Sequence, residues 1–124
     1  MTTVRLIHER FEFYHVGIFL IDDQKQYAVL KAANDETGKI LVQSGHKLGI
    51  GQRSIVGFVT DKGEARIAAD VTQDSAHYRN PILPYTRAEM ALPLKAGGDI
   101  IGALDIQSTE IGAFTNEDVS ILQT

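Results

Sequence analysis

The side chains that could hold a metal or transfer protons are spread along the chain without a recognised local motif. The four histidines are His8, His15, His46 and His77, and no two of them have the spacing of a zinc-binding helix. Folding could still bring His15 or His77 to a metal or a haem, although a hydrogen-bonded or exposed histidine is the simpler interpretation. Cysteine is absent, which excludes disulfides, thiolate metal sites and cysteine nucleophiles. The sequence therefore predicts no metal and no cofactor.

The acidic and nucleophilic side chains likewise lack the arrangement that catalysis requires. Asp70, Asp74 and Glu89 could supply an acid pair, but Asp70 leaves a predicted strand, where carboxylates more often accept backbone N–H bonds. Arg87 and Glu89 are two residues apart, so they share a face of an extended strand, either as a structural ion pair or as ligand contacts. Neither a GxSxG nucleophile elbow nor a phosphate-binding glycine loop occurs. We therefore expect that the protein is not an enzyme.

Four other side chains are better suited to binding a small molecule. They are Phe19, Tyr78, Leu83 and Thr86. Together they combine apolar walls with a few polar tips, as small-molecule pockets do, although plain core packing is the alternative. The last three lie in a long connection, residues 70–86, whose two prolines restrict the backbone. Connections of this length are usually functional, so we expect this one to cap a pocket.

Apolar runs and turn residues predict the strands that position these groups. Tyr14–Ile21 is almost continuously apolar, which is typical of a strand buried on both faces at the centre of a sheet. Alternation along this strand places Gly17 and Phe19 on one face. The other predicted strands are Gln26–Ala33, Arg66–Ala69, Ala91–Leu94 and Ile100–Ser108. The last two form a hairpin, because Gly97, Gly98 and Asp99 between them favour a turn.

The helices are predicted from capping residues and apolar spacing. Ser54–Lys62 is the clearest, because Ser54 can cap its start, apolar residues recur three and four apart, and Gly63 suits its end. A second helix is expected from Phe114 onward, with Thr115 as its N-cap. Residues 34–39 are expected to form a polar loop, and Ile40–Ser44 a weak strand.

The composition is that of a soluble globular domain. The 124 residues fit one core, and 44% hydrophobic with 23% charged residues is ordinary. A net charge of -4, with no cluster of Lys and Arg, argues against nucleic acid. No apolar run is long enough to span a bilayer, and the first residues lack the apolar core of a signal peptide. We expect a cytoplasmic protein with no nucleic-acid partner and no membrane partner.

An ordered set of residues in the second half of the chain points to a known family. The set is Asp70, Tyr78, Asn80, Pro81, Leu83, Pro84, Thr86, Arg87, Glu89 and Ala91–Leu94, followed by Ile101–Asp105. At this spacing it resembles the GAF domain, of the kind found in bacterial sensor histidine kinases and related signalling proteins. The resemblance extends from about Phe13 to Leu122. It implies an α+β fold, GAF-like (PAS/profilin-like), in which a central antiparallel sheet of five or six strands carries terminal helices on one face. Helices and loops cover a cavity on the other face.

The resemblance also implies where a ligand would bind. The floor of the cavity would come from Gly17, Phe19 and Ala33, and its walls from Ile50, Tyr78, Leu83, Thr86 and Glu89. Some subclasses are set aside, because bilin-binding photoreceptors and the methionine sulfoxide reductases of this family need cysteine. The Asn-Lys-Phe-Asp-Glu signature of the cyclic-nucleotide subclass is also absent.

The function implied is sensory or regulatory. A small-molecule effector, unknown in identity, would bind in a cytoplasmic signal-transduction protein such as a two-component histidine kinase. The terminal helices would form a homodimer and pass the signal to an output domain such as a kinase. The alternative is a ligand-free module for dimerisation and signal relay. Because the apolar pattern continues to Leu122, we expect residues 1–124 to be a single GAF-like domain excised from a larger protein, with truncated terminal helices.

Overall fold

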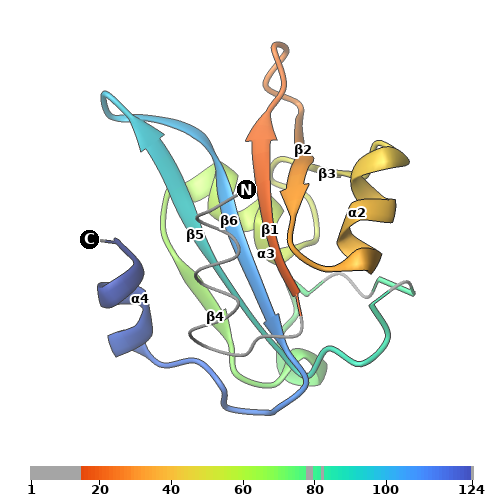
Figure 1. The fold of residues 1–124 in the computed structure, drawn as a ribbon. Coiled ribbons are helices and arrows are strands. Elements are labelled where there is room, and N and C mark those ends of the chain that lie inside the picture. Colours follow the sequence, from red (N-terminus) through yellow and green to blue (C-terminus); the bar gives the residue numbers. More distant parts are fainter. Residues whose placement is uncertain (1–14, 78–79, 82, 124) are drawn as a thin grey trace.

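A six-stranded antiparallel sheet forms the centre of the molecule (Figure 1). The computed structural model describes residues 15–77, 80–81 and 83–123. The strands are β1 (His15–Ile21), β2 (Tyr27–Ala33), β3 (Lys47–Gly49), β4 (Arg66–Ala68), β5 (Ala88–Ala96) and β6 (Asp99–Ser108). Their order in the sheet is β3-β2-β1-β6-β5-β4. The predicted central antiparallel sheet is confirmed, and the two strands expected in its interior, β1 and β6, are paired with each other at its centre.

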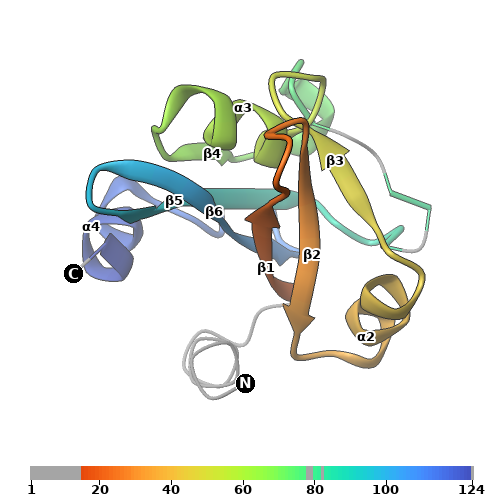
Figure 2. The same ribbon diagram turned by 90° about the horizontal axis from the view of Figure 1, so that it is seen from above.

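Helices lie on both faces of the sheet (Figure 2). They are α2 (Glu36–Gln43), α3 (Ile55–Lys62), the short 3-10 helix η1 (Val71–Gln73) and α4 (Asn116–Gln123). None of the helices within these described stretches is long and apolar enough to cross a membrane. Residues 1–14, where the truncated N-terminal helix is expected, lie outside the described residues.

Two apolar clusters hold the helices to the sheet. On one face, Phe19 of β1 packs with Leu41 of α2 and Ile55 of α3. On the other face, Val16 of β1 belongs to a cluster that includes Phe114. Val119 of α4 packs against this cluster. The alternation predicted for β1 is therefore confirmed at these positions, because successive side chains of a strand point to opposite faces.

Local capping signals correctly predicted α3, α4 and the β5–β6 hairpin. Ser54 Oγ accepts a hydrogen bond from Gly57 N at 2.7 Å, and Gly63 ends α3 with a φ of 72°. The hydroxyl of Thr115 caps α4 by accepting from Asp118 N at 3.3 Å. Gly97 and Gly98 both have positive φ, which matches the twist of a tight hairpin. The strands of this hairpin are longer than predicted, particularly β5.

The expectation of a loop and a weak strand over residues 34–44 is wrong, because this segment contains α2. Asp35 caps the helix, since its Oδ2 accepts from Gly38 N at 3.1 Å. Gly38 suggested a loop, but here it allows close packing. A Cβ at Gly38 would lie 2.4 Å from Ala33 Cβ and 3.0 Å from His15 Cε1. The helix therefore rests directly against β1 and β2, which the sequence pattern alone does not show.

Candidate ligand-binding site

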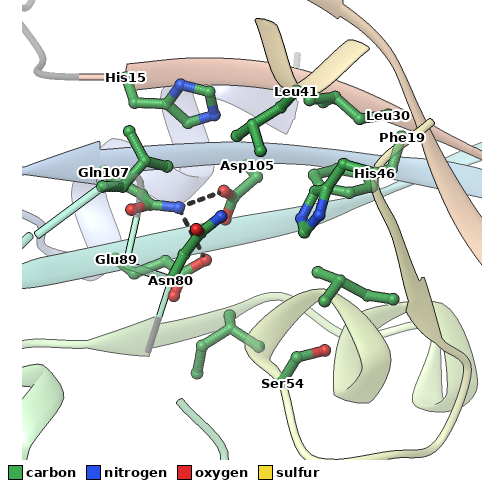
Figure 3. Close-up of a pocket in the computed structure, with 13 residues that line it drawn as sticks. His15, Phe19, Leu30, Leu41, His46, Ser54, Asn80, Glu89, Asp105 and Gln107 are labelled. Atoms are coloured by element: carbon green, nitrogen blue, oxygen red, sulfur yellow. Dashed lines mark hydrogen bonds between the residues drawn. The ribbon is translucent and has the colours of Figure 1, made fainter. Parts of the chain in front are cut away.

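A small cavity of about 20 Å³ lies between the sheet, α2, α3 and the connection between η1 and β5 (Figure 3). Its apolar lining is Phe19, Leu30, Leu41, Leu48, Ile55 and Leu83. Its polar lining is His15, His46, Ser54, Asn80, Glu89, Asp105 and Gln107. A cavity of this size holds a water molecule. Apolar walls with a few convergent polar groups are the usual make-up of a small-molecule site.

Two buried carboxyl groups form the polar wall of the cavity. Glu89 on β5 is 5% exposed and Asp105 on β6 is 2% exposed. The register pairs Glu89 with Gln107 across the two strands, and Asp105 is two residues from Gln107, so all three share one face. The side-chain amide of Gln107 donates to Asp105 Oδ2 at 2.9 Å and to Glu89 Oε2 at 3.5 Å. The amide therefore bridges the two carboxyls.

The surroundings of the pair favour protonation. Burial raises the pKa of Glu89. The pKa of Asp105 is raised well above its usual value, first by burial and then by the charge of Glu89 and a hydrogen bond between the two carboxyls. Two buried acids in contact cannot both ionise easily, and their titration belongs to the pair. The pair therefore retains a proton to higher pH than two separate carboxyls would.

One oxygen of this pair accepts no hydrogen bond from any described residue. Among the residues that the structure describes, Asp105 Oδ1 is the buried side-chain polar atom without a partner. A buried polar atom left unpaired destabilises a fold, and an ionised one does so more strongly. A proton shared with Glu89, or a donor from a bound molecule, would satisfy this oxygen. The cavity therefore offers an oxygen that can accept a hydrogen bond from a bound molecule.

Two histidine–carboxylate contacts hold the walls of the cavity in place. His77 Nδ1 lies 2.9 Å from Glu89 Oε1, which connects the residue 70–86 segment to the sheet. His15 Nδ1 lies 2.8 Å from Asp35 Oδ1, which connects β1 to the start of α2. Partial burial acts to raise the pKa of Asp35, but the hydrogen bond and charge of His15 outweigh it and lower the pKa. Asp35 is therefore ionised at neutral pH.

Another histidine, His46, lines the opposite part of the cavity (Figure 3). Burial lowers its pKa, and the charge of His15 lowers it further. His46 is therefore mostly neutral at pH 7. Among residues 15–77, 80–81 and 83–123, no group of three or more histidine, aspartate and glutamate side chains is placed to hold a metal ion.

The residues predicted for the site are only partly brought together. Phe19, Leu83 and Glu89 line the cavity. Thr86 lies beside it, and its hydroxyl donates to Gln107 Oε1 at 2.5 Å. Tyr78 lies outside the described residues.

Three further predicted residues do not line the cavity. Gly17 lies close to His15, since a Cβ there would meet the imidazole at 3.1 Å. Ala33 lies against Gly38 of α2. Ile50 belongs to the turn before α3, where its N–H donates to Gln26 O at 3.0 Å.

The ion pair considered between Arg87 and Glu89 does not form. Arg87 precedes β5, which begins at Ala88, and its side chain is exposed. Glu89 instead points inward and contacts His77. Residues two positions apart share a face only where both belong to the strand, and of these two only Glu89 does. The other acid considered, Asp70, accepts from the backbone N–H of Thr72 at 3.0 Å, as expected.

Sequence reasoning considered His15 only as a possible metal or haem ligand, and it did not identify Asp105 and Gln107 as site residues. A signal was present in β6, where polar residues stand at alternate positions of an otherwise apolar central strand. Such polar residues on one face of a buried strand need partners, so they indicate a polar pocket or a network. His15 carried no comparable local signal, because its partner Asp35 is distant in sequence.

Solved structures with the same fold include enzymes. A free methionine-R-sulfoxide reductase from Neisseria meningitidis, in complex with its substrate, matches with a TM-score of 0.81 and 24% identity, covering 98% of this chain and 67% of that chain. The expectation that the protein is not an enzyme was based on missing motifs and is contradicted by such matches. The GAF domain of a phosphoenolpyruvate-protein phosphotransferase from Coxiella burnetii matches with a TM-score of 0.83 and 24% identity. The match covers 97% of this chain and 71% of that chain.

Sequence comparisons identify the family of the chain. GAF domain-containing protein A of Dictyostelium discoideum is 27% identical over 116 residues, which are 94% of this chain and 67% of that protein. The sequence model that describes the GAF domain matches residues 2–124. The fold, the cavity on one face of the sheet and this match agree, and the chain belongs to the GAF domain family.

Proposed function

We propose that the protein is a sensory module whose small-molecule ligand presents a protonated amine to Glu89 and Asp105. The observation that carries this proposal is the buried Asp105 Oδ1 at the cavity wall, which has no hydrogen-bond partner among the residues that the structure describes. An ammonium group donates up to three hydrogen bonds and carries the positive charge that a buried carboxyl pair lacks. It would replace the proton that the pair otherwise shares.

Ligand entry requires movement of the cavity wall. The cavity of about 20 Å³ accommodates little more than water, and Asn80 and Leu83 of the connection before β5 help to close it. A larger ligand therefore binds only to a conformation in which this wall has moved outward. Such a ligand shifts the population toward the opened conformation, and this shift is the signal.

The strand β6 offers a route from the cavity to α4. Asp105 and Gln107 face the cavity, whereas Leu104 and Ile106 belong to the cluster on the opposite face, where α4 packs. A change in the position of β6 on ligand binding would therefore alter the surface on which α4 rests. In the proposed setting, a cytoplasmic signalling protein, this helix would lead to an output domain such as a kinase and would contribute to a homodimer.

The fold relatives suggest which ligands to test first. The Neisseria meningitidis protein is named for free methionine-R-sulfoxide and was solved with its substrate. A free amino acid carries the protonated amine that the Glu89–Asp105 pair fits. Methionine, methionine sulfoxide and other free amino acids are therefore the first compounds, and their N-acetyl derivatives, which lack the charged amine, are the matched controls.

Isothermal titration calorimetry tests the proposal. We expect free amino acids to bind and N-acetyl derivatives not to bind. Asp105→Asn should weaken binding at least about tenfold, because a charge-assisted hydrogen bond contributes roughly 1.5–3 kcal/mol. Asp99→Asn, an exposed change of the same chemistry on the same strand, should leave binding unchanged.

Proton release gives a second readout. If the amine replaces a shared proton, binding should release protons, so the measured heat should depend on the ionisation enthalpy of the buffer. Equal binding of free and N-acetylated compounds would refute amine recognition. No binding of any compound at millimolar concentration would favour the ligand-free relay function. Methionine formed from the sulfoxide with a reductant present would add catalysis to binding.

A further inference from the structure

A second cleft, distinct from the cavity at Glu89 and Asp105, is lined mainly by described residues between Val71 and Arg87. Its volume is about 600 Å³, which is within the size range of small-molecule sites. Leu83 lines both the cleft and the buried cavity, so it forms part of the partition between them. Arg53, just before α3, and Arg87, just before β5, both line the cleft.

No described carboxylate neutralises the two arginines. Within the part of the chain that the structure describes, neither Arg53 nor Arg87 has a carboxylate oxygen within ion-pair distance. Each makes a hydrogen bond to a backbone carbonyl instead. Arg53 Nε donates to Ser75 O at 3.1 Å, and Arg87 donates to Thr86 O at 3.3 Å. Each guanidinium has five N–H donors, so most of them remain for another partner.

The acidic groups near the cleft already have partners. Asp74, which also lines it, accepts two hydrogen bonds from Arg66, at 2.8 and 3.2 Å. His77 in the same wall contacts the buried Glu89. Asp70, outside the lining, is close enough for the charge of Arg87 to act on it, but it accepts its hydrogen bonds from Thr72. The cleft therefore keeps net positive charge in a chain whose net charge is -4.

We propose that this cleft binds a small organic anion, whose carboxylate or phosphate group lies between Arg53 and Arg87. The guanidinium fork matches both oxyanions in a two-point geometry. Val71, Leu83 and Pro84 line the same cleft, and they provide an apolar surface for the rest of the molecule. The site differs in charge from the Glu89–Asp105 cavity, so the two sites select ligands of opposite charge.

Titration followed by NMR tests this site with defined probes. The probes are benzoate and phenyl phosphate, with benzamide and phenol as their neutral counterparts and inorganic phosphate as the anion alone. We expect both aromatic anions to shift the Nε–Hε signals of Arg53 and Arg87, and the neutral compounds to leave them unchanged. Comparison of benzoate with phenyl phosphate shows which oxyanion is preferred. Ionic strength is held constant with chloride, because exposed charges are screened by salt.

Matched variants separate a built site from general charge attraction. Arg53→Gln and Arg87→Gln should each weaken benzoate or phenyl phosphate binding at least about tenfold, since hydrogen bonds to charged groups are the strong ones. Both side chains are exposed, so the variants should fold. Lys95→Gln makes the same change of net charge on the exposed end of β5 and should change affinity less than about twofold.

Two results would overturn the proposal. One is equal shifts with benzoate and benzamide, and the other is unchanged affinity in both arginine variants. Asp105→Asn should leave anion binding intact. The anion site and the proposed amine site can therefore fail independently.

Discussion

Replacing Asp105 by asparagine should stabilise the protein at pH 8. The change nearly conserves shape, and the amide oxygen can still accept from Gln107, as Asp105 Oδ2 does at 2.9 Å. The amide N–H₂ can donate to Glu89. This amide replaces the buried carboxyl of Asp105, which is only 2% exposed and whose Oδ1 has no partner among the described residues. An uncompensated buried charged group costs more than the roughly 1–3 kcal/mol of a neutral polar one, so we expect at least about 1 kcal/mol of stabilisation.

The sign of the pH dependence follows from the raised pKa values. Both Asp105 and Glu89 have a higher pKa in the folded protein than in the unfolded chain. The stabilisation from these two carboxyls is therefore complete below their pKa values in the unfolded chain, near pH 4. It is lost as the pH rises through their pKa values in the folded protein. Each unit of difference corresponds to about 1.4 kcal/mol. Asp105→Asn should reduce this loss, so its advantage should be large at pH 8 and small at pH 4.

Urea unfolding of the native protein and Asp105→Asn at pH 4, 6 and 8 measures this directly. Asp99→Asn is the matched control, because Asp99 is exposed at the hairpin end of β6 and its replacement should change stability by less than about 0.5 kcal/mol. An Asp105→Asn protein less stable than the native one at pH 8 would refute the reasoning. A stability difference that does not depend on pH would do the same.

Three further changes test the interior. Thr86→Val should cost about 1–3 kcal/mol in urea unfolding, because Gln107 loses a buried donor; no loss would place that bond in doubt. Gly102→Ala should prevent folding, judged by circular dichroism, since its Cβ would lie 2.0 Å from Phe19 O; a folded variant would contradict the strand spacing. Asp35→Asn keeps the helix cap but removes the charge beside His15. Because the pKa of Asp35 is lowered, its charge stabilises the folded protein above about pH 4. This stabilisation disappears as the pH falls through the pKa of Asp35 in the folded protein. The variant should therefore be less stable at pH 7 and equal to the native protein near pH 2; a difference that persists at pH 2 would exclude the ionic origin.

The elements predicted correctly from the sequence are those with local signals. The apolar run of β1, the cap at Ser54 and the paired glycines of the β5–β6 turn each specify structure within a few residues. The helix α2 was not predicted, although Asp35 caps it, because it contains Gly38 and its apolar residues form one short run, Ile40–Val42. Its stability comes from contacts with β1 and β2, where Asp35 meets His15 and Leu41 enters the core.

The site was predicted less well than the fold for a physical reason. Leu83 and Glu89 lie in or beside the long connection, where composition already indicated a pocket. Asp105 and His15 acquire their roles from the register of three strands, β5, β6 and β1. That register is a long-range property, so neighbouring residues in the sequence do not reveal it. The exclusion of enzymes was wrong for a related reason, because the absence of a local motif says nothing of what other proteins do with this fold.

The central position of β1 has a consequence for the order of folding. β5 and β6 form a hairpin with a short turn, so Glu89, Asp105 and Gln107 can meet within microseconds. β1 pairs with β6 only after a loop of most of the chain has closed, which is slower (Figure 1). Because burial raises the pKa values of the two acids, they should take up a proton when β1 and its helices dock. Stopped-flow refolding at pH 6 with an indicator dye should show proton uptake in the slow phase. The protonation of Glu89 and Asp105 would then measure when β1 pairs with β6.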